Sequence, residues 1–252
     1  MKTAFITGTT AGFGKATALR LAKLGYNVII TGRRKERLDE LAKLIGSEYS
    51  VQVLPLCFDV RDREACRNAV ETLPEEWKSI DILVNNAGLA AGSSPINEYD
   101  IDDWERMIDT NVKGLLYITR AITPLMVAAN KGHIINLSSI AGVEVYPGGS
   151  VYCATKHAVN ALTKGMRIDL LKHNIKVSSI SPGAAETEFS TIRFHGDQQK
   201  ADAVYQGLTP LNAEDIADAV EYIVTRPAHV NINDILITPV RQANTYLYNR
   251  SE

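Results

Sequence analysis

The sequence predicts an α/β protein built on one doubly wound parallel sheet. Short runs rich in β-branched residues alternate with longer segments whose apolar residues recur at helical spacing. This alternation indicates βαβ units, whose right-handed crossovers favour the doubly wound topology. Two of the runs, NVIIT at 27–31 and DILVNN at 81–86, have continuous apolar centres, as strands covered on both faces do.

Seven strands and the helices between them follow from this pattern. The expected strands are residues 3–7, 27–31, 51–58, 80–85, 133–138, 175–181 and 235–238. Apolar residues at helical spacing mark helices within 16–24 and 38–45, and a later helix is expected over 150–173. No repeat, low-complexity tract or linker rich in Gly, Ser or Pro divides the chain, so we expect a single domain over 1–252.

Composition and charge exclude several classes of partner. Apolar residues make up 45% of the chain and charged residues 22%, and the net charge of −2 favours neither nucleic acid nor an anionic membrane. The N-terminal MKTAFITG is typical of a first strand rather than of a secretory signal, and no run approaches the roughly 18 apolar residues of a membrane span. Cys57, Cys66 and Cys153 show no metal spacing. We therefore expect a cytoplasmic protein without a metal site.

A glycine-rich turn directly follows the first strand. Its sequence, TGTTAGFG at 7–14, places Gly8, Gly12 and Gly14 between that strand and a helix. Glycine permits a tight turn and lets the backbone approach a pyrophosphate, which the free N–H groups at the helix start attract. The spacing is G-x3-G-x-G rather than the common G-x-G-x-x-G, and three glycines could also serve a turn alone. The position between strand and helix favours a dinucleotide site.

The end of the second strand indicates which form of the nucleotide binds. NAD sites usually place an acidic residue there, which accepts a hydrogen bond from the adenosine ribose. This strand is followed instead by Gly32, Arg33 and Arg34, and guanidinium groups suit the 2′-phosphate of NADP. The alternative is that both arginines are solvated charges at the start of the next helix. The missing acid favours NADP.

Tyr152 and Lys156 lie four residues apart, on one face of the expected helix. A free tyrosine, with a pKa of about 10, is a poor base at neutral pH. A cation about 4 Å away at an effective dielectric of about 20 contributes about 4 kcal/mol, or roughly three pKa units. We therefore expect the pKa of Tyr152 at about 7, where general acid–base catalysis is efficient. On its own, Tyr-x-x-x-Lys is also typical of an aromatic side chain beside a solvated lysine.

Polar residues on other elements support a catalytic role for this pair. Ser138 and Ser139 close the fifth strand, at the carboxyl edge where doubly wound sheets bind ligands. A serine hydroxyl there could hold a substrate oxygen while the tyrosine exchanges its proton. Asn111, on the helix after the fourth strand, could anchor a water leading onward from the lysine. The alternative is that these residues only cap strands and helices.

Together these motifs resemble the short-chain dehydrogenase/reductase family in order and spacing, over nearly the whole chain. They are TGTTAGFG at 7–14, Asn85-Asn86-Ala87-Gly88, Asn111, Ser139, Tyr152-x-x-x-Lys156 and Pro182-Gly183. The resemblance implies a Rossmann-type fold and hydride transfer with an NAD(P) cofactor. The implied catalytic residues are Asn111, Ser139, Tyr152 and Lys156. It gives Ser139, the second of the two serines, the contact with the substrate.

The resemblance also implies a set of cofactor contacts. These are Gly8, Thr9, Thr10, Gly12, Phe13, Gly14, Arg33, Arg34, Asp59, Val60, Asn86, Ala87, Gly88, Tyr152, Lys156, Pro182, Gly183, Ala185 and Thr187. In this scheme Asp59 and Val60 flank the adenine. Asn86 and Gly88 flank the ribose, and residues 182–187 flank the nicotinamide.

One position departs from the family pattern. NADP-preferring members often carry a basic residue just before the middle glycine of the turn, where this chain has Ala11. Our expectation of NADP therefore depends on Arg33 and Arg34.

The segment after the sixth strand indicates the substrate class. Residues 185–197, KADAVYQG at 200–207 and HVNIN at 229–233 resemble NADP-dependent 3-hydroxy acid dehydrogenases, a subgroup that includes serine 3-dehydrogenase and L-allo-threonine dehydrogenase. This resemblance implies oxidation of the 3-hydroxyl of L-serine, L-allo-threonine, 3-hydroxyisobutyrate or 3-hydroxypropionate, or reduction of the matching semialdehydes. A short hydroxy acid needs a cation for its carboxylate. Within a substrate loop of about residues 184–212, Arg193 is the first candidate and Lys200 the second, although Arg193 could instead pair locally.

Other functions fit the sequence less well. A 3-oxoacyl carrier-protein reductase needs a basic surface for its acidic partner, and this near-neutral chain shows no obvious one. A sugar or steroid reductase would favour a more apolar insert than residues 187–212, and another carbonyl reductase of the same family is a further alternative. A non-catalytic NADPH-binding protein would need neither Tyr152 nor Lys156.

The resemblance implies a homotetramer, because family members commonly assemble through the helices that carry Asn111 and Tyr152 and through the C-terminal segment. Apolar residues on more than one face of 150–173, such as Val151 and Leu170, fit burial against both the sheet and a partner. A single thick core would explain the same pattern.

Overall fold

The computed structural model describes residues 1–250, which form the parallel sheet expected from the sequence. Its strands are β1 (Thr3–Ile6), β2 (Asn27–Gly32), β3 (Val53–Cys57), β4 (Ile82–Asn85), β5 (Gly132–Leu137), β6 (Ile175–Pro182) and β7 (Asp234–Ile237). They lie in the order β3-β2-β1-β4-β5-β6-β7, and every neighbouring pair is parallel. The predicted doubly wound α/β fold is confirmed.

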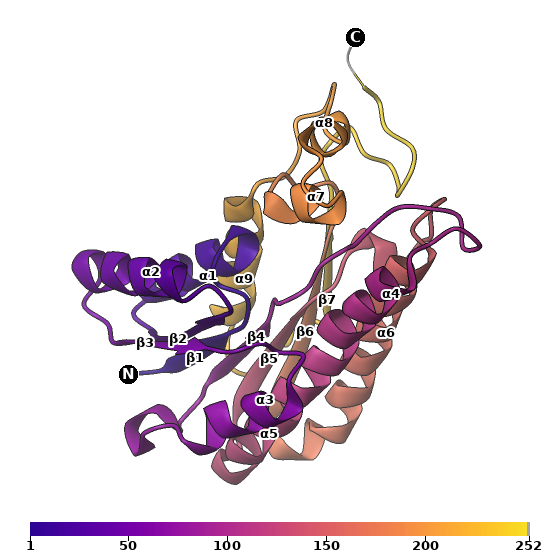
Figure 1. The fold of residues 1–252 in the computed structure, drawn as a ribbon. Helices are drawn as coiled ribbons and strands as arrows, with labels where there is room; N and C mark the ends of the chain where they lie inside the picture. The colour runs from indigo at the N-terminus through magenta and orange to yellow at the C-terminus, as the bar shows by residue number, and fades with distance from the viewer. Residues whose placement is uncertain (251–252) are drawn as a thin grey trace.

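Helices cover both faces of this sheet (Figure 1). They are α1 (Gly12–Lys23), α2 (Lys35–Glu48), α3 (Arg63–Glu71), α4 (Ile101–Ile108), α5 (Leu115–Ala129), α6 (Ser150–Asp169), α7 (Glu188–Arg193), α8 (Gln198–Ala203) and α9 (Ala213–Val224). α1, α2 and α9 lie on one face, and α3 to α6 lie on the other. α7 and α8 lie beyond the carboxyl ends of the strands, near the C-terminal segment (Figure 1).

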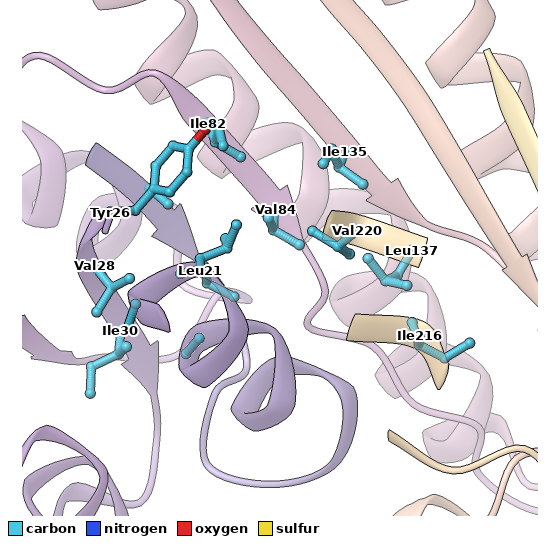
Figure 2. Packing of buried hydrophobic residues seen from close by; sticks show 14 of the residues in the cluster. Leu21, Tyr26, Val28, Ile30, Ile82, Val84, Ile135, Leu137, Ile216 and Val220 are labelled. Carbon is cyan, nitrogen blue, oxygen red and sulfur yellow. The ribbon is translucent and has the colours of Figure 1, made fainter. Parts of the chain in front are cut away.

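Each face of the sheet has its own apolar core. Figure 2 shows the first, in which Leu21 of α1 and Val220 of α9 pack near Val84 of β4. The adjacent Leu83 points the other way and joins the second core with Ile118 of α5. Burying each such side chain contributes about 1.5–3 kcal/mol. The central strands are therefore apolar on both faces, which is why their sequence shows no alternation.

The topology brings the motifs of the sequence to one edge of the sheet. The strand order reverses between β1 and β4, and ligands bind doubly wound sheets at the carboxyl side of such a reversal. The glycine turn at 7–14 follows β1, Asn86 follows β4, and Ser138 and Ser139 follow β5. These segments therefore converge on a common crevice.

A helical run on the second face differs from the expectation. α4, a π-helical turn (Asp109–Gly114) and α5 are continuous over 101–129. This run is long and apolar enough, by length and composition, to cross a membrane, although we expected no such stretch. The core helix of a soluble protein passes the same test, and here Ile118, Ile122 and Met126 pack into the second core.

Candidate active site

The turn between β1 and α1 has the conformation of a phosphate-binding turn. Gly8 (φ 71°) and Gly12 (φ 52°) adopt the left-handed backbone that other residues rarely adopt. A Cβ on Gly14 would lie 2.3 Å from the carbonyl oxygen of Gly8, so this position also needs glycine. The turn therefore fits the close approach of a dinucleotide pyrophosphate. Thr9 has a different role, because its buried hydroxyl donates to the carbonyl of Thr31 at 3.2 Å and holds the turn against β2.

A cavity of about 540 Å³ extends from this turn past the carboxyl ends of β4, β5 and β6. Most of the predicted site residues line it: Gly8, Thr10, Gly12, Phe13, Arg33, Arg34, Asp59, Val60, Asn86, Ala87, Gly88, Ser139, Tyr152, Lys156, Pro182, Gly183, Ala185, Thr187 and Arg193. Thr9, Gly14 and Asn111 do not line it, and they act on the cavity through their neighbours. Among residues 1–250 no group of three or more His, Cys, Asp or Glu side chains could hold a metal ion.

The two arginines predicted to bind the 2′-phosphate lie at one end of the cavity and differ in their contacts. Arg34 donates to the hydroxyl of Thr10 through Nε at 3.0 Å and Nη2 at 2.7 Å, and to Glu188 through Nη1 at 2.8 Å. Arg33 has a looser contact, with Nη1 3.6 Å from Asp59. Both cations thus lie beside the predicted adenosine site, with Arg34 held by Thr10 and Glu188.

Tyr152, Lys156 and Ser139 converge at the other end. Tyr152 and Lys156 are both buried on α6, and the Nζ of Lys156 donates to the carbonyl of Leu137 at 2.9 Å. Ser139 follows β5, accepts from the N–H of Ala141 at 3.1 Å and donates to the carbonyl of Pro182 at 3.4 Å, and its hydroxyl lowers the pKa of Tyr152. The structure therefore brings the predicted serine, tyrosine and lysine together, although they come from two separate elements.

The pKa of Tyr152 differs from the expected value of about 7. Burial raises it well above the ordinary value, and the nearby Tyr146 raises it further, whereas Ser139 and Arg193 lower it only in part. The Nζ of Lys156 lies 5.9 Å from the centre of the Tyr152 ring. Burial also lowers the pKa of Lys156 to about 8. The expectation counted the attraction of a cation and omitted the cost of burying both charges.

Asn111 lies in the π-helical turn rather than in an ordinary helix as expected. Its Nδ2 donates to the carbonyl of Leu89 at 2.8 Å and to Thr155 at 3.0 Å, and its Oδ1 accepts from the N–H of Leu89 at 2.8 Å. A Cβ on Gly88 would meet both Asn111 Oδ1 at 3.3 Å and Lys156 Nζ at 3.4 Å. Asn111 thus holds the segment after β4 against the lysine, and π-helical turns are frequent at functional sites.

Arg193, at the end of α7, places a positive charge near the phenol. Its Cζ lies 5.3 Å from the ring centre of Tyr146, and its Nε donates to the carbonyl of Gly92 at 3.3 Å. The charge of Arg193 lowers the pKa of Tyr152 relative to burial alone. The second candidate, Lys200, pairs with Asp197 at 3.3 Å and does not line the cavity.

Several lining residues were missed by sequence reasoning. Tyr146, Tyr205, Gln242 and Tyr248 all line the cavity. Gln242 shows why: its Oε1 accepts from the N–H of Ala184 at 2.7 Å, across 58 residues of sequence. Arg37 of α2, which lies outside this cavity, was also missed, although its position close after Arg33 and Arg34 in the sequence could have identified it. It bonds Glu188 at 2.6 Å.

A family comparison agrees with this arrangement. The model of the family described as short chain dehydrogenase matches residues 2–198. That match includes the glycine turn and the converging serine, tyrosine and lysine.

Individual relatives are similar over almost their whole length. A probable NADP-dependent dehydrogenase of Haemophilus influenzae is 49% identical, covering 96% of this chain and 94% of the relative. An NADP-dependent 3-hydroxy acid dehydrogenase of Schizosaccharomyces pombe is 46% identical, covering 96% and 93%. A solved closed form of serine dehydrogenase complexed with NADP+ superimposes with a TM-score of 0.93 at 45% identity, covering 99% of this chain and 100% of that one.

Proposed function

This chain belongs to the short-chain dehydrogenase family, and we propose that it is an NADP-dependent oxidoreductase of small 3-hydroxy acids. It would oxidise the 3-hydroxyl of L-serine, L-allo-threonine, 3-hydroxyisobutyrate or 3-hydroxypropionate, or reduce the matching semialdehydes. The observation that carries this proposal is that the guanidinium of Arg193 and the phenol of Tyr152 line one cavity, with the Arg193 charge acting on the phenol. A short substrate with a carboxylate and a hydroxyl could reach both groups.

NADP as the cofactor agrees with the relatives of this chain. The Haemophilus influenzae and Schizosaccharomyces pombe relatives are named NADP-dependent, and the serine dehydrogenase structure contains NADP+. Arg33 and Arg34, at the end of β2, carry the charge that suits a 2′-phosphate. When bound, NADP would supply the hydride acceptor for the oxidation, and NADPH the hydride donor for the reverse reaction.

The side chains at the reacting end divide the remaining work. In the oxidation, Tyr152 takes the proton of the 3-hydroxyl as its carbon loses a hydride, so the carbon becomes a carbonyl. Ser139, which lines the same cavity as Tyr152, would hold the same substrate oxygen. Lys156 stabilises the phenolate by its charge, and Asn111 fixes the segment that carries Gly88 beside it.

The proton step needs the phenolate form of Tyr152. Burial disfavours its phenolate, so oxidation is expected to be faster at alkaline pH. The carboxylate of the substrate would pair with Arg193 and bring the hydroxyl between Ser139 and Tyr152.

Assembly and location complete the proposal. A homotetramer is supported by the exposed apolar side chains Ile101, Ile108 and Leu116, which lie on the α4–α5 run. A cytoplasmic location fits the free thiols of Cys57, Cys66 and Cys153.

A substrate panel tests the reaction. NADP reduction should be measured at alkaline pH with L-serine, D-serine, L-allo-threonine, 3-hydroxyisobutyrate and a secondary alcohol. We expect turnover of hydroxy acids and little with the alcohol. Activity on the alcohol alone would favour another carbonyl reductase of the family and end the hydroxy-acid proposal.

The Tyr152→Phe variant tests the mechanism in the same assay. It should abolish turnover, because phenylalanine has no hydroxyl to accept or return the proton. NADPH binding, measured by fluorescence, should stay near that of the parent. A residual rate within tenfold of the parent would exclude Tyr152 as the acid–base group.

A further inference from the structure

Glu188 connects the substrate segment to the arginines beside the nucleotide turn. Its Oε1 accepts from Arg37 Nη1 at 2.6 Å, and its Oε2 accepts from Arg34 Nη1 at 2.8 Å. The other two nitrogens of Arg34 donate to the hydroxyl of Thr10. Every nitrogen of this guanidinium is therefore already engaged by an oxygen of the protein.

The position of Glu188 in the chain links two parts of the cavity. Glu188 is the first residue of α7 and itself lines the cavity, as does Thr187, whose hydroxyl caps that helix by accepting from the N–H of Phe189. Five residues later the same helix ends at Arg193. One short element thus carries both a carboxylate at the nucleotide end and the cation proposed to bind the substrate.

These ion pairs are suited to exchange rather than to permanent structure. The side chains of Arg34, Arg37 and Glu188 are 41%, 44% and 43% exposed, and pairs this exposed are individually weak. The pKa of Glu188 nevertheless lies below its ordinary value: burial raises it, and the hydrogen bonds from both arginines more than offset that effect. The carboxylate is therefore charged at neutral pH.

We propose that Glu188 competes with the 2′-phosphate of NADP(H) for Arg34 and Arg37. Phosphate and carboxylate prefer the same planar donors of a guanidinium. NAD(H) lacks this phosphate, so the competition acts on the discrimination between the two nucleotides. Because Glu188 begins α7, exchange of the carboxylate for phosphate also releases the start of that helix. This inference rests on the proposed function, since it takes NADP as the cofactor.

Nucleotide fragments test the competition without involving the nicotinamide. Binding of 2′,5′-ADP and of 5′-AMP should be measured by calorimetry for the parent, for Glu188→Gln and for Glu40→Gln. Glutamine keeps the shape of residue 188 and removes its charge. Glu40 is a matched control, because it lies near Arg37 beside the same turn and pairs with no cation among residues 1–250.

We expect Glu188→Gln to bind 2′,5′-ADP about threefold to tenfold more tightly. The reason is that the substitution removes a negative charge that would repel the 2′-phosphate from the exposed arginines. Its affinity for 5′-AMP should change by less than about twofold, and Glu40→Gln should match the parent with both probes. Unchanged or weaker binding of 2′,5′-ADP by Glu188→Gln would overturn the competition. An equal gain in Glu40→Gln would overturn it as well, since the effect would then be one of general charge.

Hydrogen exchange tests the link to α7. In the parent, 2′,5′-ADP should speed amide exchange across residues 188–193, 5′-AMP should not, and Glu188→Gln should show fast exchange with neither probe bound. Equal exchange in all these states would overturn the link.

The calorimetric results distinguish failure of the competition from failure of the proposed cofactor. If the parent prefers 2′,5′-ADP and Glu188→Gln binds no better, only the competition fails. If the parent binds both probes equally, NADP as the cofactor fails first, and the competition falls with it.

Discussion

Arg193 lies among aromatic side chains at the reacting end of the cavity. Its charge lowers the pKa of five tyrosines relative to burial alone: Tyr99, Tyr146, Tyr152, Tyr205 and Tyr248. Its backbone is fixed as well, because the N–H of Gly92 donates to its carbonyl at 2.8 Å. A cation held in this way could serve a substrate carboxylate and also favour the phenolate form of Tyr152.

Replacing Arg193 separates these roles from cofactor binding. Arg193→Ala should raise the KM for L-serine about tenfold or more, because a charge-assisted hydrogen bond of about 1.5–3 kcal/mol is lost. The affinity for NADPH should change by less than about twofold. Steady-state kinetics and NADPH fluorescence check both expectations. Lys200→Ala is the matched control and should leave KM unchanged; equal KM values for Arg193→Ala and the parent would remove Arg193 from the substrate site.

Some properties of single residues could be predicted from the sequence and others could not. Arg33 and Arg34 were predicted as ligands of a 2′-phosphate because of their position at the end of the second strand, and the structure places both in the lining of the cavity. Our prediction for the pKa of Tyr152 was wrong. Burial and the approach of Tyr146 determine that pKa, and both depend on the packed structure and not on the sequence spacing to Lys156.

Whole elements were predicted where their pattern is periodic. All the strands were found, but their ends moved by up to two residues, as at β3 (Val53–Cys57) where 51–58 was expected. The π-helical turn over Asp109–Gly114 was missed, because one extra residue in a helical turn leaves the apolar periodicity on both sides almost intact.

Helix α9 has a start signal strong enough to test. The side chain of Asn212 accepts from the N–H of Glu214 at 2.8 Å and of Asp215 at 3.1 Å, and the Asp215 carboxylate accepts from the N–H of Asn212 at 2.8 Å. This reciprocal cap matters beyond α9, because Arg20 of α1 bonds three carboxylates along α9, one of them that of Glu214.

Asn212→Ala should lower the free energy of unfolding by about 1 kcal/mol, because two N–H groups lose their acceptor. Urea unfolding at a fixed protein concentration measures this change. Asn212→Ser keeps an oxygen at the cap and should stay near the parent. If alanine and serine destabilise the protein equally, the cap contributes nothing and the loss comes from elsewhere in the side chain.

At the scale of the molecule, the strand order followed from the sequence because right-handed crossovers and strand–helix alternation leave few arrangements. The same rules placed the glycine turn and Ser139 at one edge. They could not place the C-terminal segment, whose Gln242 reaches Ala184, because no periodicity or crossover rule governs a loop contact. The cavity was thus predicted on its nucleotide side and only in part on its substrate side.

His133 links β5 to β6 and gives the molecule an acid-sensitive stability. Ser178 donates to the carbonyl of Ile232 at 2.6 Å, so at 2.8 Å it accepts from the Nε2–H of His133. Burial, aided by the charge of Lys176, lowers the pKa of His133 to about 3. An unfolded histidine has a pKa of about 6.5, so below that pH the unfolded chain binds a proton that the folded protein excludes. The stabilisation is complete above about pH 6.5 and is lost as the pH falls toward 3.

From pH 7 to pH 5, His133 should account for about 2 kcal/mol of lost stability. His133→Gln should have a lower free energy of unfolding than the parent at pH 7, because glutamine packs less well at this position. Because the variant lacks the titrating imidazole, its free energy of unfolding should fall less steeply toward pH 5. Urea unfolding at both pH values and a fixed protein concentration measures the slopes. His229→Gln, at an exposed position, should keep the slope of the parent. Equal slopes for His133→Gln and the parent would show that the acid sensitivity arises from other groups.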